Sequence, residues 1–297
     1  MRVAVLFFGE VRGFPELWKR IYDRMVAPNS ADVFMHNYYY KEDFLEEYND
    51  DPEMKQTLID YYKNKGLNLY PNPELATIFK PKGQILETRQ NFVKGQEDTV
   101  DKIITSLGNN KYLQHGRKFI ENDFNTIMGQ HYSRKSVIQL KCEYEKANNF
   151  KYDAVIISRI DINILGLLKV PGPPLSILAK ILSPNVSIFE QIIIGRSSEI
   201  DALLTMFEAA PELYIKYCDT NIYFMQNERF TFMHLKNNDV FVRHMNFPLD
   251  YSRSRNGLSR FNKSFIIESD NTQTTQIVFN ENKIDVHMPR KKKWRMF

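Results

Sequence analysis

The sequence predicts an α/β fold with a mostly parallel central sheet flanked by helices. Apolar stretches at 3–8, 31–39 and 154–157 have the length and composition of buried strands. Their apolar residues are consecutive rather than alternating with polar ones, which is typical of strands covered by helices on both faces. Helical patterns at 16–26 and 133–150 are interspersed with them, and such alternation favours parallel pairing.

The N-terminal elements follow in a simple order. The strand at 3–8 ends in a turn at 9–14, and a helix at 16–26 begins after Pro15. The second strand, 31–39, begins after a proline-containing turn.

The middle of the chain has weaker patterns. Residues 41–66 are charged and helix-prone, whereas three prolines in 67–81 predict short extended pieces. From 84 to 122 the polarity is high, so we expect a surface insertion with helical parts at 99–107 and 117–124.

The clearest helix lies at 133–150. Val137, Leu140 and Tyr144 recur on one face at i, i+3 and i+7, and Ser133 is the expected N-cap. This helix leads directly into the strand at 154–157.

The C-terminal half begins with a break at 170–174, "VPGPP". Residues 187–211 predict a strand, a turn at Gly195 and a helix capped near Ser197 or Ser198. Residues 227–242 predict a helix and then a strand.

Charge separates the body of the chain from its end. The formal net charge is +4, from 40 cations and 36 anions, but residues 289–297 carry five cations. Without them 35 cations face 36 anions, a net charge of −1, which excludes a nucleic-acid-binding face over the body. With Trp294 and Phe297 among its cations, the basic tail either contacts an anionic membrane surface or is simply solvated.

The cysteines and the length of the apolar stretches indicate the cellular compartment of the protein. Cys142 and Cys218 make no disulfide framework and are expected as buried thiols in a reducing compartment. The apolar run at 3–8 is too short for a signal peptide, and no stretch is long enough to cross a bilayer. We therefore expect a cytoplasmic protein.

Several well-known motifs do not occur. The turn "FFGEVRGF" is not a GxGxxG fingerprint, and GxxxxGK[ST], GxSxG and HExxH do not occur. None of the six histidines has zinc-ligand spacing to a cysteine or aspartate.

Polar residues instead follow the apolar strands where each one ends. They are Gly9 and Arg12, His36 and Asn37, and Arg159 and Asp161. Because ligands gather at the carboxyl ends of parallel strands, these residues predict a site at that edge.

Asp161 and Asn163 form a D-x-N pair at the end of a strand. Two such oxygens facing one ligand, with a diphosphate, are enough to bind Mg²⁺ or Mn²⁺. Arg12 and Arg159 could offset phosphate charge through bidentate hydrogen bonds. In the alternative, Arg159 and Asp161 form an ion pair and Asn163 is a turn-forming residue.

Five stretches together resemble a family of small GT-A-fold glycosyltransferases from bacterial polysaccharide clusters and giant algal viruses, of the chlorovirus capsid-glycan type. They are "VLFFGEVRGF" (5–14), "ADVFMHNYY" (31–39), the Tyr-Ser helix with its following strand (131–162), "FEQIIIGRSSEIDALLTMFE" (189–208) and "NERFTFMHLKNNDV" (227–240). They cover about a third of the chain, and their order and spacing make the resemblance specific.

The resemblance implies a single GT-A-like domain over 1–297. Residues of about 1–168 would bind the nucleotide-sugar and about 169–288 the acceptor, with 289–297 as a basic tail. The implied activity is metal-assisted, inverting transfer of a sugar from a nucleotide-sugar donor to a glycan hydroxyl. A non-catalytic nucleotide- or glycan-binding module of the same fold is the alternative.

The resemblance also implies roles for single residues. Those expected at the donor are Gly9, Arg12, His36, Arg159 and Gln191. Asp161 would contact the metal or the donor, with Mn²⁺ or Mg²⁺ held by Asp161 and Asn163. Asn163 departs from the D-x-D pattern, which removes one anionic ligand.

An inverting transfer needs a base for the acceptor hydroxyl. Glu190 is the candidate, with Gln191 beside it to orient the hydroxyl; otherwise it is an ordinary polar residue at a strand end. Glu228 is expected only to start a helix capped by Asn227, and His234 to pack within that helix.

Two tyrosines lie near the expected site. Tyr38 and Tyr39 could offer ring faces to a sugar or a nucleobase. Packing in the core is the alternative.

Overall fold

A computed structural model describes most of the chain. The described residues are 1–11, 15–39, 52–64, 72–88, 96–107, 117–183, 187–217, 226–245, 249–250, 276–280 and 283–287.

Strands and helices alternate along the chain. The strands are β1 Val3–Glu10, β2 Asp32–Tyr39, β3 Gly83–Thr88, β4 Ala154–Arg159, β5 Asn163–Ile164, β6 Ile177–Ser183, β7 Ser187–Gly195, β8 Val242–His244, β9 Leu249–Asp250, β10 Gln276–Asn280 and β11 Lys283–His287. The helices are α1 Pro15–Ile21, α2 Pro52–Asn64, α3 Asn72–Phe79, α5 Glu97–Leu107, α6 Arg117–Ala147, α7 Ser197–Asp201, α8 Met206–Tyr217 and α9 Gln226–Asn237. A π-helical turn, Tyr22–Val26, continues α1, and 3₁₀ turns cover Ala27–Asn29 and Ala202–Thr205.

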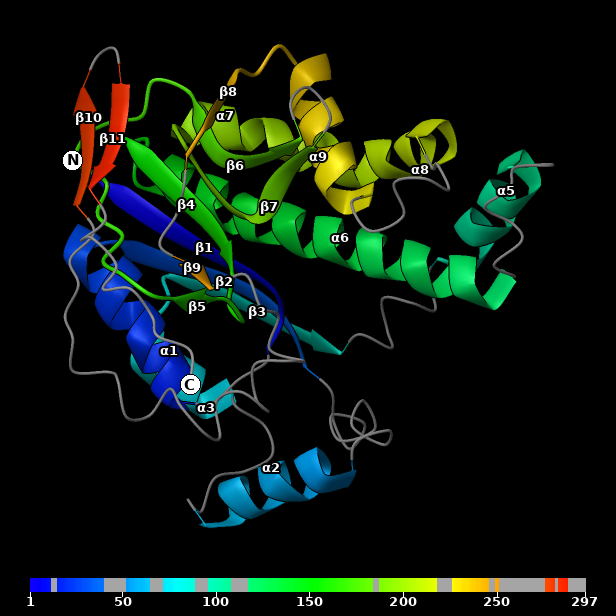
Figure 1. Ribbon diagram of the computed structural model, residues 1–297, viewed down its shortest axis with the longest axis horizontal. Helices are drawn as coiled ribbons and strands as arrows, with labels where there is room; N and C mark the ends of the chain where they lie inside the picture. Colours follow the sequence, from blue (N-terminus) through cyan, green and yellow to red (C-terminus); the bar gives the residue numbers. More distant parts are fainter. Residues whose placement is uncertain are drawn as a thin grey trace, which may run out of the picture.

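Seven strands form the central sheet, in the order β3-β2-β1-β4-β7-β6-β8 (Figure 1). Four of its six neighbouring pairs are parallel, and only β7 pairs antiparallel with its neighbours β4 and β6. This α/β, Rossmann-like arrangement confirms the predicted fold class at that level. The predicted strands at 3–8, 31–39 and 154–157 are β1, β2 and β4.

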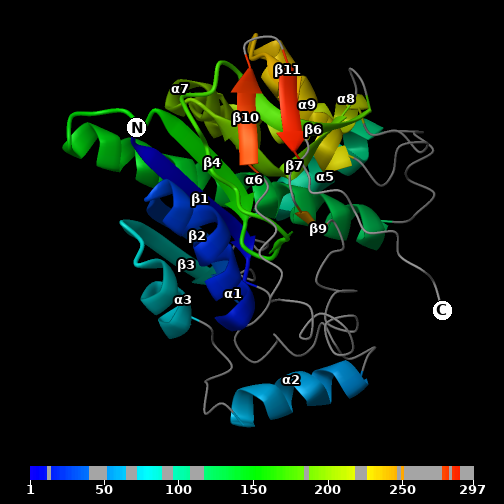
Figure 2. The same cartoon turned by 60° about the vertical axis from the view of Figure 1, so that its left-hand side comes forward.

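Helices cover both faces of the sheet, and the side chains of β1 alternate between them. Val3, Val5 and Phe7 pack in one core with residues of α1 and α3. Ala4, Leu6 and Phe8 pack in a second core with residues of α6, α7 and α9. Figures 1 and 2 show α1 and α3 on one side of the sheet and α6 on the other. The continuous apolar strands are thus explained by two-sided burial.

A third core extends beyond the sheet along α6. Apart from Tyr38 of β2, its buried residues come from α5, α6, α8 and α9, and include Ile103, Phe124, Tyr214 and Phe230. Tyr214 stacks edge-on against both Phe124 and Phe230, with ring centroids 5.3 and 5.9 Å apart. This core holds α8 and α5 against the far end of α6.

One long helix replaces two predicted ones. The segments at 117–124 and 133–150 belong to α6, which runs without interruption for 31 residues. Ser133 is therefore inside the helix and is not its N-cap. Its burial explains the difference, because its hydroxyl bonds to the sheet instead of to a helix terminus.

Two elements contradict the reading of residues 67–122. The proline-rich stretch contains α3, because Pro73 occupies the first turn, where a missing N–H costs nothing. The polar stretch contains β3, which pairs in parallel with β2 at the edge of the sheet. Its residues are only partly buried, so they do not produce an apolar run.

The predictions for 187–211 and 227–242 are confirmed in outline. β7 ends at Gly195, and α7, a 3₁₀ turn and α8 follow it; the helix and strand at 227–242 are α9 and β8. The N-cap of α7 is Arg196, one residue before the predicted serines, and β6 was not predicted. Cys142 is a free, half-buried thiol, and Cys218 lies outside the described residues. Among the described helices, none has both the length and the apolar character that a membrane span requires.

Candidate functional site

The strand register brings most of the predicted site residues to one edge of the sheet. Phe8 of β1 is level with His36 of β2 and with Arg159 of β4. Since β7 is antiparallel to β4, its residues before Ile192 lie beyond the level of Ser158, at the same edge.

This edge therefore contains the strand-end residues predicted from sequence, among them Gly9, His36, Arg159, Asp161, Glu190 and Gln191. Arg12 lies outside the described residues. The backbone of Asn163 pairs with Asp250 in the short β5–β9 ladder, and its side chain is outside the described part.

Gly9, next to the last residue of β1, has a backbone that only glycine adopts readily. Its φ is +94°, and a Cβ added there would meet no atom of the described residues within 4 Å. Its N–H donates to Ser133 Oγ (2.8 Å), and its carbonyl accepts from Asn37 Nδ2 (3.2 Å). The open space beside this backbone allows a ligand to approach it closely.

His36 is fully buried on the α6 face of β2, between aromatic rings. Its ring lies edge-on to those of Tyr38 and Tyr132, with centroids 5.4 and 5.5 Å apart. Burial lowers the pKa of His36 to about 4, so the imidazole is neutral at pH 7. Tyr38 is itself only 2% exposed, so its ring packs in the interior, as the alternative held. The side chain of Tyr39 is not among those described.

Arg159 and Asp161 form a buried bidentate ion pair. Arg159 Nε donates to Asp161 Oδ1 at 2.7 Å, and Nη2 donates to Oδ2. Both side chains are less than a tenth exposed. The ion pair, given above as the alternative to a metal site, is therefore present, and each carboxylate oxygen accepts a bond from the guanidinium.

Glu190 forms a second buried ion pair, with Arg134 of α6. Arg134 Nη2 donates to Glu190 Oε2 and to its carbonyl oxygen, while Asn227 Nδ2 lies 3.3 Å from Oε1. Arg134 is fully buried, and its guanidinium lies 4.7 Å from the centre of the Phe8 ring. The candidate base thus has a cation on one oxygen and only a long hydrogen bond on the other.

Sequence reasoning missed Arg134 and Ser133, although the resemblance included the segment that contains them. An arginine within an amphipathic helix is ordinarily solvated, and nothing in the local pattern indicates burial. The signal was indirect: Glu190 is an anion in an apolar strand, and a buried anion needs a cationic partner.

The α9 residues have structural contacts. Asn227 lies within α9, which begins at Gln226, and its amide bonds to Gln130 and Glu190; its predicted role as N-cap is wrong. His234 is buried and its Nε2 lies 3.0 Å from the carbonyl of Ala202, which agrees with the expected packing role.

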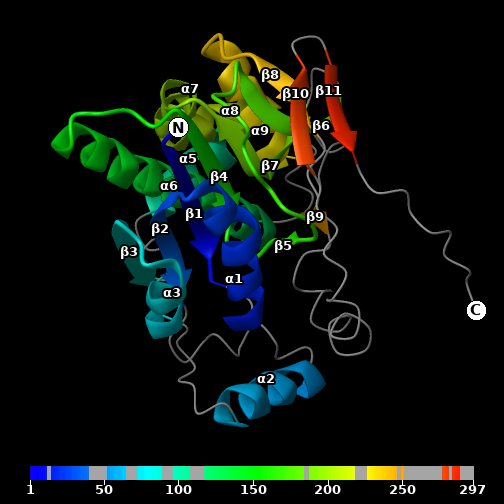
Figure 3. The same ribbon diagram turned by 90° about the vertical axis from the view of Figure 1, so that its left-hand side faces the viewer.

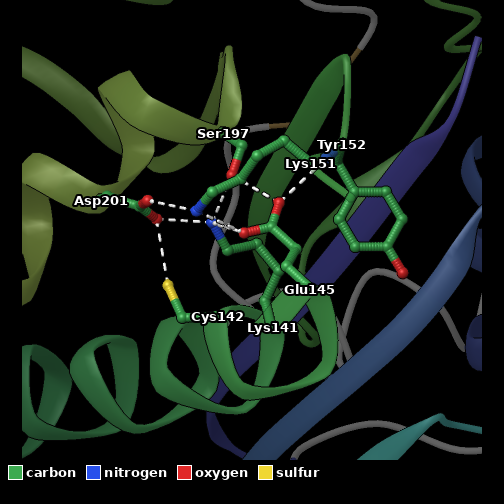
Figure 4. Close-up of polar contacts among 7 residues, drawn as sticks. All are labelled: Lys141, Cys142, Glu145, Lys151, Tyr152, Ser197 and Asp201. Atoms are coloured by element: carbon green, nitrogen blue, oxygen red, sulfur yellow. Dashed lines mark hydrogen bonds and ion pairs between the residues drawn. The ribbon is translucent and has the colours of Figure 1, made fainter. Parts of the chain in front are cut away.

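The described residues contain one three-residue group with metal-ligand geometry, Cys142, Glu145 and Asp201. Figure 4 shows that two lysines already occupy it. Lys141 pairs with Asp201 and lies 3.3 Å from Glu145, and Lys151 lies 2.8 Å from Glu145. An ion placed here would face two ammonium groups at close range, which is unfavourable.

This group is also distant from the candidate site along the sheet. Glu145 accepts from the backbone N–H of Tyr152 (2.9 Å), just before β4 begins. It therefore lies at the amino end of β4, whereas Asp161 follows the carboxyl end. Burial, with Asp201 nearby, raises the pKa of Cys142 to about 11, so this sulfur is a protonated thiol and a poor metal ligand.

The chain was also compared with known proteins. No family model matches it, and neither the curated proteins nor the solved structures contain a match.

Proposed function

We propose that the protein is a nucleotide-sugar-dependent glycosyltransferase of GT-A type, which transfers a sugar to a glycan hydroxyl with inversion. The main supporting observation is the convergence at one sheet edge. The open backbone of Gly9 lies near the end of β1, beside the end of β4, where Arg159 pairs with Asp161. Such an edge is where α/β folds bind phosphorylated ligands, and the sequence resemblance points to the same residues.

In this proposal the donor diphosphate lies against the Gly9 backbone. Arg12, Arg159 and His36 would contact the donor, and the guanidinium groups would offset the charge of the departing nucleoside diphosphate. Asp161 would hold Arg159 in place through their two hydrogen bonds and contact the donor from the same position.

Glu190 would be the base for the acceptor hydroxyl, assisted by Gln191. Its Oε1 accepts only a long contact from Asn227, so an incoming hydroxyl could replace that amide. Its Oε2 would remain with Arg134, which fixes the carboxylate in position. Only Oε1 is thus suited to take a proton.

A divalent ion was expected at Asp161 and Asn163, as Mn²⁺ or Mg²⁺. The arrangement of Asp161 does not fit that ion, because both carboxylate oxygens accept bonds from Arg159. A neutral residue at position 163 also supplies no second charge. The proposed transfer therefore uses the charge of Arg159 and is derived without a metal at this position.

A non-catalytic nucleotide- or glycan-binding module is the second candidate. The observation that favours it is that both predicted catalytic carboxylates, Asp161 and Glu190, are held in buried ion pairs. Such pairs stabilise a binding site as well as a reaction centre.

Donor binding and donor hydrolysis test the two candidates. We expect one of the UDP-, GDP- or TDP-sugars to raise the melting temperature, and Asp161→Asn to abolish that rise. Asp153→Asn is the matched control, because Asp153 is exposed before β4 and its carboxylate accepts from the Arg2 N–H. No shift with any donor contradicts the transferase and the nucleotide-binding form of the module. Binding without donor cleavage, even with glycan acceptors, supports the module and contradicts the transferase.

A further inference from the structure

His36 and Glu87 face each other across neighbouring strands without a hydrogen bond between them. His36 Nε2 lies 3.7 Å from Glu87 Oε1. Tyr38 of β2 is level with Glu87 of β3. Glu87 therefore lies beyond the level of His36, nearer the carboxyl edge of the sheet. Nε2 is buried and has no hydrogen-bond partner among the described residues.

The hydrogen bonds of Ser133 fix the tautomer of this histidine. The Ser133 hydroxyl donates its single proton to the His36 carbonyl (2.8 Å). Its oxygen must then accept from the two remaining neighbours, Gly9 N–H (2.8 Å) and His36 Nδ1 (2.9 Å). The proton of the neutral ring is thus on Nδ1, and Nε2 presents a lone pair.

Two acceptors therefore face one another, a ring lone pair and a carboxylate oxygen. A separation of 3.7 Å is too long for a hydrogen bond, even if one group gained a proton. It is close to the distance between two ligands of one metal ion. Histidine nitrogen and glutamate oxygen bind Zn²⁺ at about 2.0–2.2 Å, which places them roughly 3.4–3.6 Å apart at tetrahedral or trigonal angles.

The neighbouring groups support the two ligand atoms. A metal-bound histidine characteristically donates its other ring N–H to an oxygen, as His36 does to Ser133. Tyr132 Oη lies 3.3 Å from Glu87 Oε1 and helps to orient the carboxylate. The Glu87 side chain is 32% exposed, so an ion can reach the pair from solvent and keep water on its open positions.

We infer that a divalent transition-metal ion of the Zn²⁺ class binds between His36 Nε2 and Glu87 Oε1, with water completing its coordination. This position differs from Asp161 and from the Cys142 group, where arginine and lysine side chains occupy the carboxylates. The inference does not depend on the transferase proposal. If that proposal holds, the ion lies at the same sheet edge as Gly9 and can bind a donor oxygen.

Calorimetric titration of the full chain with ZnCl₂, and the visible spectrum of the Co²⁺-loaded chain, test the site without nucleotide. We expect one ion per chain and a Co²⁺ spectrum of low coordination number with nitrogen and oxygen ligands. Glu87→Gln should weaken binding at least tenfold. Glu121→Gln is the matched control, since its side chain is 34% exposed and bonds to Arg117 in the first turns of α6. It should bind the ion like the parent chain.

His36→Asn gives a second, independent variant. The asparagine amide can take the place of Nδ1–H toward Ser133 but offers nothing in the position of Nε2, so we expect the same loss of binding. Circular dichroism verifies that each variant is folded.

Three results would overturn the inference: no ion bound by the parent chain, equal affinity in Glu87→Gln, or a thiolate-to-cobalt charge-transfer band, which would place the ion at a cysteine. Donor binding measured separately in the presence of a chelator tests the transferase proposal, so failure of one can be distinguished from failure of the other.

Discussion

A single hydroxyl, that of Ser133, joins three elements of the protein. It accepts from the N–H of Gly9 in β1 and from the ring of His36 in β2, and it donates to the His36 carbonyl from its place in α6. All three groups are buried, where an unpaired polar atom is costly. The turn after β1 and the tautomer of His36 therefore depend on this one side chain.

Ser133→Ala should destabilise the protein by about 1–3 kcal/mol, because it leaves buried donors and an acceptor without partners. The free energy of unfolding in urea measures this loss. Ser198→Ala is the control: Ser198 is exposed in α7, and an exposed substitution of this kind changes stability by about 0.5 kcal/mol or less. Equal effects of the two substitutions would show that the Ser133 bonds add nothing to stability.

The helices and strands differ in how far the sequence could predict them. β1, β2 and β4 were predictable because each is buried on both faces and reads as an apolar run. β3 was not, because it lies at the sheet edge and its residues are only half-buried. The length of α6 was obscured because its N-terminal half packs against α5 and α8 instead of the sheet, so its apolar face changes direction.

The candidate site was predictable in outline only. The polar residues at the strand ends predicted the edge of the sheet at which the site lies. The register of β1 with β2 and β4 places His36 and Arg159 at that edge. The partners of the predicted carboxylates depend on contacts between distant segments, such as Arg134 with Glu190, 56 residues apart. Local periodicity contains no information on such contacts.

An ion-pair network joins α6, α7 and the entry to β4. Glu145, nearly fully buried, accepts from Lys151 (2.8 Å), Ser197 Oγ (2.6 Å) and the N–H of Tyr152 (2.9 Å). Burial alone would raise the pKa of Glu145, but these bonds outweigh it and the pKa is lowered. The charged form is thus favoured by folding.

A lowered pKa of Glu145 has a defined effect on stability. The contribution is fully present above the unfolded value of about 4.3 and is lost as pH falls through the lower folded value. We expect Glu145→Gln to be less stable than the parent chain at pH 7, with the difference shrinking below about pH 4.5. Urea unfolding over pH 3–7 measures it. Glu143→Gln, exposed on the same helix, should show no such pH-dependent difference; a constant difference for Glu145→Gln would contradict the network's role.

Charge is unevenly distributed over the protein. In its interior, basic side chains are paired with carboxylates, as in the ion pairs of Arg134, Lys141 and Arg159. The excess positive charge of the sequence comes from residues 289–297, which lie outside the described part. Figure 3 shows the same body from the side, with α1 and α3 packed beside the strands of the central sheet. We therefore expect any attraction to an anionic surface to come from the tail.

Deletion of residues 289–297 should change the net charge from +4 to −1, since five cations are removed from a balance of 40 to 36. Each basic residue near an anionic membrane contributes about 1 kcal/mol, an effect that salt screens. We expect the full chain to sediment with phosphatidylserine vesicles at low salt and to dissociate from them at high salt. It should not bind phosphatidylcholine vesicles. The shortened chain should remain in solution with an unchanged melting temperature.

Replacing Trp294 and Phe297 by alanine separates the electrostatic attraction from aromatic insertion. Loss of binding with all five cations retained would identify aromatic insertion as the stronger of the two. If the shortened chain bound vesicles as well as the full chain, the attraction would come from the body, against its net charge.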